Sequence, residues 1–168
     1  MIIREERPVD VESLRAVNLE AFETSTEADL VDALRGRATP LISLVAEDGA
    51  NVVGHILFSP VTLESEPGLT LLMGLAPMAV VPSRQRQGVG SSLVLEGLER
   101  CRQVNGAGVV VLGHPEYYPR FGFLPAARLF LRCEYDVPEE VFMVRELREG
   151  AVCGLSGTIR YHPVFGEF

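Results

Sequence analysis

Residues 71–91 read Leu71-Leu-Met-Gly-Leu-Ala-Pro-Met-Ala-Val-Val-Pro-Ser-Arg-Gln-Arg-Gln-Gly-Val-Gly-Ser91. The first half of this stretch, 71–81, is almost wholly apolar and has the length and composition of a buried strand. After the glycines, apolar residues fall on one helical face, namely Val89, Leu93, Val94, Leu98 and Cys101. The segment from Leu71 to Asn105 therefore predicts a strand, a glycine turn and an amphipathic helix. This arrangement directs free backbone N–H groups and the helix dipole toward an anion.

The two glycines of the turn suit an anion site, because Gly88 and Gly90 let the backbone approach a ligand without a Cβ atom in the way. A pyrophosphate is the anion that we expect there. An ordinary strand-to-helix turn has the same pattern, so the turn alone does not decide between the two. The better-known phosphate loops do not fit, since the third glycine of G-x-G-x-x-G and the Gly-Lys-Ser/Thr ending of P-loop NTPases are both missing.

Pro77 interrupts the apolar segment and adds a second signal. Proline cannot donate a hydrogen bond to a neighbouring strand, so it belongs at sheet edges or bulges. A strand that is apolar on both faces is not an edge strand, and we therefore predict a β-bulge at Ala76-Pro77. A bulge leaves main-chain groups unpaired, and an amide-bearing ligand is a suitable partner for them. A ligand with a pyrophosphate at one end and a peptide-like arm at the other is coenzyme A.

Two motifs carry a family resemblance. Residues 78–91 resemble the acetyl-CoA motif of the GNAT superfamily of N-acetyltransferases, Gln/Arg-x-x-Gly-x-Gly/Ala after a strand. Tyr118-Pro-Arg-Phe-Gly-Phe123 resembles the Tyr-x-x-x-Gly-Phe of the second conserved region of that family. The resemblance covers roughly residues 2–125, and the remainder looks like a less-studied bacterial branch. It implies an α/β fold: a mixed, largely antiparallel twisted sheet with helices on both faces and a splay between strands four and five.

The resemblance also implies a set of residues that bind acetyl-CoA. Backbone groups near the end of the apolar strand would contact the pantetheine arm and the acetyl group, and the glycine turn would hold the pyrophosphate. These residues are Met78, Ala79, Val80, Arg86, Gln87, Gly88, Val89, Gly90 and Ser91. Arg84 and Arg86 are expected to supply a local positive patch, and no metal is expected.

Tyr118 stands where the resembling family carries a tyrosine that protonates the departing thiolate. A phenol with the usual pKa of about 10 is neutral at working pH and can give up that proton. A tyrosine packed for structural reasons is the alternative. Pro119 disfavours helical geometry at the residue before it, so we predict Tyr118 as a helix N-cap. Tyr117 is the alternative proton donor.

The general base is poorly marked, because residues 71–74 carry no carboxylate where some relatives of the family keep a glutamate. His114, after the next predicted strand, is the best-placed group that can accept a proton near neutral pH. A structural histidine and deprotonation through water are the alternatives. In the resembling family, the two N-terminal helices and their connection, here 22–28, often wall the acceptor site. Three glutamates lie in this region and we expect them to be solvated: Glu20, Glu23 and Glu27.

Composition limits the other possibilities. The chain has 168 residues, of which 47% are hydrophobic and 23% charged, which suits one globular domain spanning 1–168. The net charge of −8 disfavours nucleic acid and favours a cationic partner. The N-terminus is charged too early for a signal peptide, no apolar segment reaches the roughly 20 residues of a membrane span, and the three cysteines form no paired motif. We therefore expect a cytoplasmic protein with reduced cysteines and no membrane contact.

Patterning along the chain predicts the remaining elements. A first strand is expected at 2–6, and helices are expected to begin at Asp10 and near Thr26. Segments 41–46 and 52–58 flank an Asp-Gly turn and predict a hairpin, which the 71–81 strand extends into an antiparallel meander. Later strands are expected at 108–113, 130–135, 141–144 and 157–161.

These observations predict an enzyme: an N-acetyltransferase that moves the acetyl group of acetyl-CoA to a primary amine by direct attack in a ternary complex. A non-catalytic module that binds or senses coenzyme A or acyl-CoA is the alternative. The acceptor is expected to be a small-molecule or peptide amine, and the sequence does not choose among polyamines, antibiotic-like amines, amino acids and proteins. The sequence also leaves open whether the protein is a homodimer and whether it uses acyl chains longer than acetyl.

Overall fold

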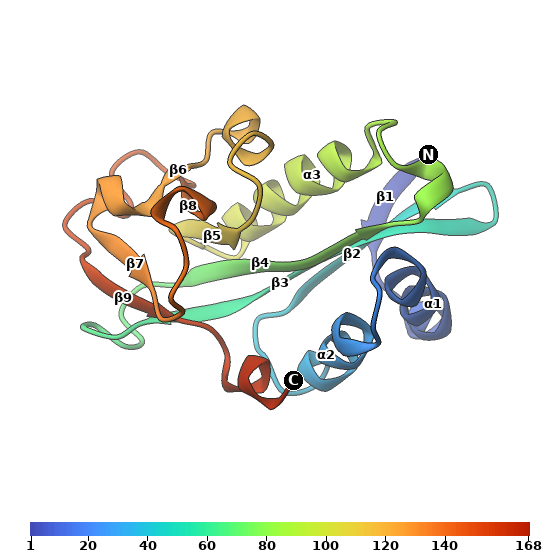
Figure 1. Ribbon diagram of the computed structural model, residues 1–168, viewed down its shortest axis with the longest axis horizontal. Helices are drawn as coiled ribbons and strands as arrows, with labels where there is room; N and C mark the ends of the chain where they lie inside the picture. The colour runs from blue at the N-terminus through green and yellow to red at the C-terminus, as the bar shows by residue number, and fades with distance from the viewer.

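A nine-stranded sheet forms the framework of the computed structural model, which describes residues 1–168. The strands follow the order β1-β2-β3-β4-β5-β8-β6, and β9 pairs with both β3 and β7 (Figure 1). Only β4 with β5 and β7 with β9 are parallel. The strands are β1 (Ile2–Glu5), β2 (Ile42–Asp48), β3 (Asn51–Leu63), β4 (Leu72–Val80), β5 (Gly108–Leu112), β6 (Leu124–Pro125), β7 (Leu131–Cys133), β8 (Phe142–Glu146) and β9 (Gly157–Arg160).

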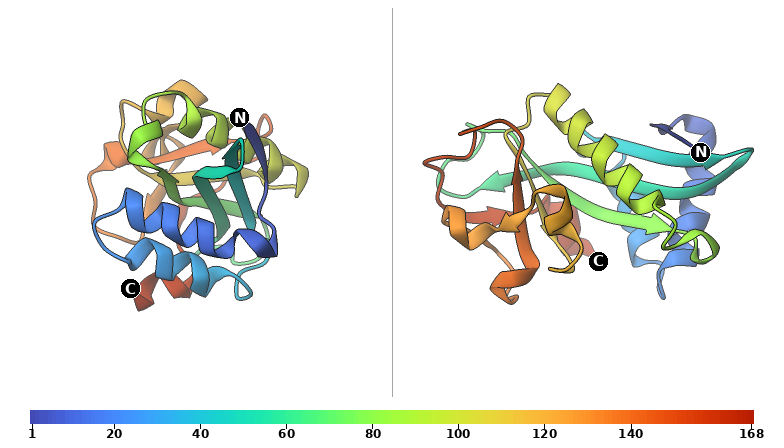
Figure 2. Two further views of the ribbon diagram at one scale, coloured as in Figure 1. Left: turned by 90° about the vertical axis from the view of Figure 1, so that its right-hand side faces the viewer. Right: turned by 90° about the horizontal axis from the view of Figure 1, so that it is seen from above.

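Three α-helices cover the sheet: α1 (Val11–Ala21), α2 (Thr26–Leu34) and α3 (Val89–Gln103). α1 and α2 lie side by side on one face, and α3 lies on the other (Figures 1 and 2). The predicted fold class, with a largely antiparallel sheet and helices on both faces, is confirmed. Short 3₁₀ helices complete the chain: η1 (Pro8–Asp10), η2 (Pro82–Arg84), η3 (Tyr118–Phe121), η4 (Ala126–Leu129), η5 (Glu139–Val141) and η6 (Pro163–Glu167). None of the helices combines the length and apolarity that a membrane crossing requires.

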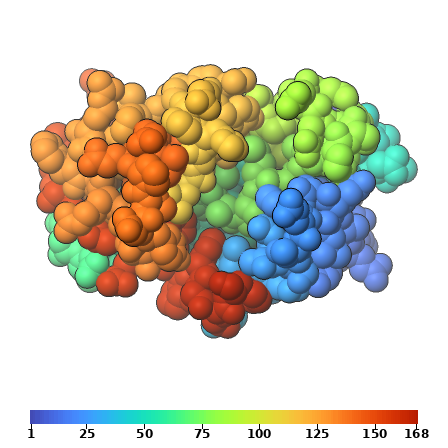
Figure 3. All heavy atoms as spheres, in the orientation of Figure 1, coloured from blue at the N-terminus to red at the C-terminus, as the bar shows by residue number.

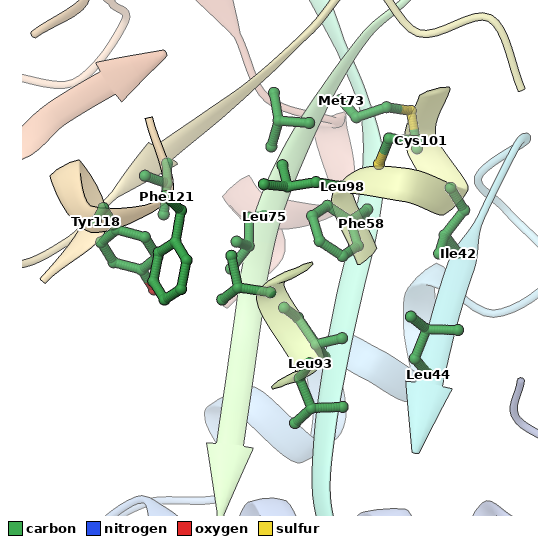
Figure 4. Packing of buried hydrophobic residues seen from close by; sticks show 14 of the residues in the cluster. Ile42, Leu44, Phe58, Met73, Leu75, Leu93, Leu98, Cys101, Tyr118 and Phe121 are labelled. Atoms are coloured by element: carbon green, nitrogen blue, oxygen red, sulfur yellow. The ribbon is translucent and has the colours of Figure 1, made fainter. Parts of the chain in front are cut away.

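The largest hydrophobic cluster lies between α3 and the sheet and contains 20 buried residues. Leu93 and Leu98 of α3 pack over Phe58 of β3 and Leu44 of β2 (Figure 4). The inner face predicted from the helical spacing is therefore the buried one, and Cys101 lies on it with 0% exposure. This packing fixes α3 against the middle of the sheet, and with it the position of its N-terminus.

The predicted bulge in β4 is present. Pairing between β3 and β4 steps from Ile56 opposite Met78 to Phe58 opposite Leu75, so that Ala76 and Pro77 both lie opposite a single residue. The Ala76–Pro77 peptide bond is cis. Pairing of β4 with β5 stops at Leu75, although β4 continues to Val80. The two strands therefore part from the bulge onward, which is the predicted splay.

The structure differs from the sequence-based expectations mainly in the last third of the chain. β3 extends to Leu63, well past the predicted end at 58, because its last residues pair with β9. The strand expected at 130–135 is reduced to Leu131–Cys133, since η4 and a left-handed Phe130 precede it. β6 was not predicted. Pairings between segments so far apart in the chain leave little trace in the local pattern.

Candidate active site

A cavity of about 510 Å³ lies where β4 leaves β5. Most of the ligand-binding residues predicted from the sequence line it. The lining residues are Met78, Val80, Gln85, Arg86, Gly88, Gly90, Ser91, Tyr117 and Arg120. In the space-filling view the centre of the molecule is hollowed, between the yellow segment that follows β5, the green segment that leads into α3 and the blue helices α1 and α2 (Figure 3).

The N-terminus of α3 presents unpaired backbone donors to this cavity. None of the N–H groups from Arg86 to Ser91 has a hydrogen-bond acceptor within the protein, and the first one that does is Ser92 N–H, which donates to Gly88 O over 3.0 Å. Arg86 and Gly88 both have left-handed backbone, with φ of 61° and 89°. Such conformations turn successive N–H groups inward, a geometry that suits an anion.

Two arginines supply positive charge at the cavity, but they are not the expected pair. Arg86 lines it as predicted. Arg84 does not, because its guanidinium forms an ion pair with Asp48. Arg120 is the second arginine that lines the cavity, and its guanidinium lies 4.6 Å from the centre of the Tyr117 ring. Its position inside the Tyr-x-x-x-Gly-Phe motif is a variable one, so the motif could not single it out.

The open edge of β4 explains how main-chain groups could serve a ligand. Val81 N–H donates to Val53 O of β3 over 3.0 Å. Because successive N–H groups of a strand point in opposite directions, those of Val80 and Met78 point away from β3, toward the side that β5 has left. Gln85 Nε2 donates to Val80 O over 2.9 Å on the same side. The remaining predicted residues contribute no lining side chain: Ala79 and Val89 are buried and Gln87 bonds to Ser83 O.

The two neighbouring tyrosines have different surroundings. Tyr117 lines the cavity, and its hydroxyl lies 3.3 Å from Ser91 Oγ. Tyr118 is 7% exposed, and burial raises the pKa of its phenol to about 12. Its ring packs against Gly113, just after β5, and lies beside Phe121 (Figure 4). The predicted N-cap position is wrong by one residue: Tyr117 is the N-cap, since Pro119 fits the first turn of a helix, where no N–H is needed.

The histidines are not brought into the cavity. His114 has an exposed side chain and does not line it, while its carbonyl accepts from Tyr117 N–H over 3.0 Å. His55 is fully buried between Asn18 Nδ2 at 3.2 Å and Ser43 Oγ at 2.8 Å. Because the amide nitrogen can only donate, Nδ1 of His55 accepts and Nε2 carries the proton. Burial, reinforced by Arg35, lowers the pKa of His55 to about 3, so this imidazole is neutral and structural.

The predicted glutamates divide into two kinds. Glu20 and Glu23 are exposed, as expected for a solvated face. Glu27, in the first turn of α2, differs because its Oε2 atom is buried and has no hydrogen-bond partner. No group of three or more His, Cys, Asp or Glu side chains is arranged to hold a metal ion.

Comparison with known proteins identifies the class to which this fold and site belong. Residues 40–125 match the sequence model of the acetyltransferase (GNAT) domain. The chain belongs to the GNAT acetyltransferase family, as the two motifs predicted, and the predicted enzyme class is confirmed.

Particular relatives extend the likeness to the whole chain. The N-acetyltransferase YhbS of Escherichia coli K12 is 38% identical over 100% of both chains. The crystal structure of E. coli YhbS in complex with CoA has a TM-score of 0.91 and covers 99% of this chain, which covers 92% of that one. A GNAT family acetyltransferase from Brucella melitensis, in complex with acetyl-CoA, is 35% identical with a TM-score of 0.80, and 98% and 97% of the two chains are covered.

Proposed function

We propose that this protein transfers the acetyl group of acetyl-CoA to a primary amine by direct attack within a ternary complex. The observation that carries the proposal is the row of unpaired N–H groups from Arg86 to Ser91 beside the gap where β4 leaves β5. Two similar structures, of E. coli YhbS and of the Brucella protein, hold CoA and acetyl-CoA.

The residues of the cavity fit acetyl-CoA in two parts. The N–H groups at the start of α3 would bind the pyrophosphate, with Arg86 and Arg120 offsetting its charge. The N–H groups of Met78 and Val80 would pair with the peptide-like pantetheine arm, replacing the strand that β4 lacks there. The acetyl group would then lie toward the bulge, just beyond Leu75, where pairing with β5 ends.

The transfer forms a bond from nitrogen to the acetyl carbon and breaks the bond from that carbon to sulfur. The amine loses one proton, and the thiolate that departs gains one. Tyr118 is the proposed donor of that second proton, because the raised pKa keeps its phenol protonated at neutral pH. No carboxylate of the cavity is placed to take the first proton, so we assign it to water, with His114 as the alternative base.

The decisive measurement is the release of free coenzyme A from acetyl-CoA in the presence of a panel of primary amines, with the acetylated amine identified by mass spectrometry. Calorimetric titration of coenzyme A should show binding in the same preparation. Binding without amine-dependent release would instead support the alternative, a module that senses coenzyme A or acyl-CoA. The absence of a carboxylate from residues 71–74 is the observation that favours this alternative.

A further inference from the structure

The short helix η3 and its N-cap carry three side chains that the proposed reaction uses. Tyr117 and Arg120 line the cavity, and Tyr118 is the proposed proton donor. Pro119, in the first turn of η3, has no N–H group to donate. A single 3₁₀ turn also makes few internal hydrogen bonds, and these have poorer geometry than those of an α-helix. The turn therefore depends on support from outside itself.

Arg145 of β8 supplies such support at the C-terminal end of η3. Its Nε atom donates to Phe121 O, the last carbonyl of the helix, over 3.0 Å. Its Nη1 atom donates to Glu146 O of its own strand. A cation at this end of a helical turn is favourable, because the carbonyls there carry partial negative charge and lack partners. The partly buried guanidinium thus bridges η3 and the sheet.

The arginine side chain takes over where backbone pairing stops. The ladder between β6 and β8 ends at Leu124 opposite Val144. Arg145 is the next residue of β8, and on the other side of that strand it lies opposite Val109 of β5. Its backbone is therefore held within the sheet, while its side chain reaches the turn that precedes β6.

Gly122 leaves room for this side chain. A Cβ atom at residue 122 would stand 2.7 Å from Arg145 Nε and 3.2 Å from Arg145 Cζ. The φ of Gly122 is 88°, which also favours glycine. A side chain at this position would therefore displace the guanidinium as well as strain the backbone. The glycine of Tyr-x-x-x-Gly-Phe admits an arginine that lies outside the motif.

Aromatic contacts connect the supported end of η3 to the two tyrosines. The ring centres of Phe121 and Tyr117 lie 5.2 Å apart, and those of Tyr117 and Tyr118 lie 5.1 Å apart. A Cβ atom at Gly113 would stand 2.3 Å from Cε2 of Tyr118, so this ring has no spare room on the side of β5. In so closely packed a group, a shift of the backbone at Phe121 would move both tyrosines.

We propose that Arg145 is a positioning residue for the transfer: by holding the end of η3, it fixes the positions of the Tyr117 and Tyr118 hydroxyls. It does not line the cavity, so it acts through η3 and not on the ligand. This inference rests on the proposed acetyl transfer, in which Tyr118 gives a proton to the departing thiolate.

The first test removes both hydrogen bonds of the arginine. In Arg145→Met, kcat with a verified amine should fall about tenfold or more, because small displacements of catalytic groups are costly. Arg145→Lys should recover little, since an ammonium group does not reproduce the planar donors of a guanidinium. Arg148→Met, at an exposed position just after β8, is the matched control and should keep the wild-type kcat. A wild-type kcat in Arg145→Met overturns the proposal.

The second test separates positioning from a general loosening of the fold. If Arg145 acts through Tyr118, Tyr118→Phe should reduce kcat much less in the Arg145→Met protein than in the wild type. Independent effects would instead multiply in the double variant. An undiminished effect of Tyr118→Phe in the Arg145→Met protein overturns the proposal.

The third test perturbs the same contact from the other side and does not require that Arg145→Met folds. Gly122→Ala should lower kcat, whereas Gly150→Ala should not. Gly150 has a φ of 78°, but nothing lies within 4 Å of a Cβ atom there, so this control carries the backbone strain without the clash. The double variant of Gly122→Ala and Arg145→Ala should lose less kcat than the product of the two single losses. Equal kcat in the two glycine variants overturns the proposal.

Coenzyme A binding keeps the inference testable without turnover. Because Tyr117 and Arg120 line the cavity, calorimetric titration should show weaker coenzyme A binding to Arg145→Met than to the wild type or Arg148→Met. If amines are acetylated and Arg145→Met keeps the wild-type kcat, the positioning role fails and the acetyl transfer stands. If no amine is acetylated but binding weakens in Arg145→Met alone, the transfer fails and the positioning of η3 stands. Without acetylation, an unchanged Kd in Arg145→Met overturns the positioning role as well.

Discussion

Phe58 of β3 lies so close to Gly97 of α3 that a Cβ atom at residue 97 would stand 2.2 Å from Cε1 of the ring. The Phe58 ring therefore packs directly against the helix backbone at Gly97, where the helix has no side chain of its own. Because Phe58 is fully buried, its ring has no free space into which it could move. The contact holds α3 at a fixed height above the sheet, and the turn with the unpaired N–H groups leads into that helix.

Gly97→Ala should consequently destabilise the protein. Overpacking of a buried contact costs about 1–3 kcal/mol, which exceeds the roughly 1 kcal/mol that alanine gains over glycine in a helix. Denaturant unfolding measures the difference. Gly166→Ala is the control, since nothing lies within 4 Å of a Cβ atom at that position. A Gly97→Ala variant as stable as the wild type would show that α3 can lift without cost.

Gly90→Val should weaken acetyl-CoA binding at least tenfold, or about 1.4 kcal/mol, while the fold survives. A Cβ atom there would lie 3.1 Å from the Tyr117 hydroxyl and 3.6 Å from Met78 Cε, inside the cavity. Calorimetric titration is the measurement, and Leu95→Val, at an exposed position of the same helix, is the control. Unchanged affinity in a folded Gly90→Val variant would move the pyrophosphate away from this turn.

Tyr118→Phe should lower kcat by about 10²–10⁴-fold, the usual loss when a general acid is removed. Acetyl-CoA affinity should barely change, because the lost interaction belongs to the transition state. Tyr117→Phe removes the hydroxyl beside Ser91 and should act mainly on acetyl-CoA binding. The reverse pattern, with kcat lost in Tyr117→Phe and kept in Tyr118→Phe, would assign proton donation to Tyr117.

The raised pKa of Tyr118 also predicts the shape of the rate profile. A general acid acts only while protonated, so its contribution to kcat falls as pH rises through its pKa. With a pKa of about 12 in place of the ordinary 10.0, kcat should not decline through loss of this proton below pH 10.0. A stopped-flow pH series with a verified acceptor checks this. A Tyr118-dependent decline that begins nearer pH 8 would contradict the burial of the phenol.

His55 predicts a stability change at mildly acidic pH. The unfolded chain protonates this histidine below its ordinary pKa of 6.5, whereas the native protein does so only near 3. The unfolded state therefore binds more protons in this window, and the free energy of unfolding should fall as pH drops from 6.5, by up to about 1.4 kcal/mol per pH unit. His55→Gln should have a smaller slope, and His114→Gln should keep the wild-type slope. Equal slopes in all three proteins would contradict a buried neutral His55.

Local signals in the sequence predicted the shape of the cavity beside β4. A proline inside an apolar strand has few structural solutions, so Pro77 predicted the bulge, and the family resemblance implied the splay. Gly88 and Gly90 before an amphipathic helix predicted a turn with free N–H groups, because backbone freedom is a property of the residue itself. The inner face of α3 was also predicted, because the spacing of apolar residues along a helix is a local property of the sequence.

The buried, unpartnered hydroxyls of Ser59 and Tyr161 could not be predicted in this way. Ser59 lies in an apolar strand and Tyr161 at the end of the last one, and neither position is unusual by itself. Their missing partners become visible only when β9 returns to β3 and carries the tyrosine over Gly74. The environment of Arg84 was missed for a similar reason, since its partner Asp48 lies at the end of β2, far away in the chain.

The pairing of β5 with β8 has a consequence for truncated forms of this protein. The segment that matches the family, 40–125, ends before β8, which covers the outer edge of β5, and before β9, which covers the end of β3. A fragment cut there would expose two unpaired strand edges, and such edges recruit other chains. It should aggregate rather than act as a minimal enzyme. We therefore propose that the family-wide part and the remainder fold together, and that a fusion partner or label is better attached at either end of the full chain than at residue 125.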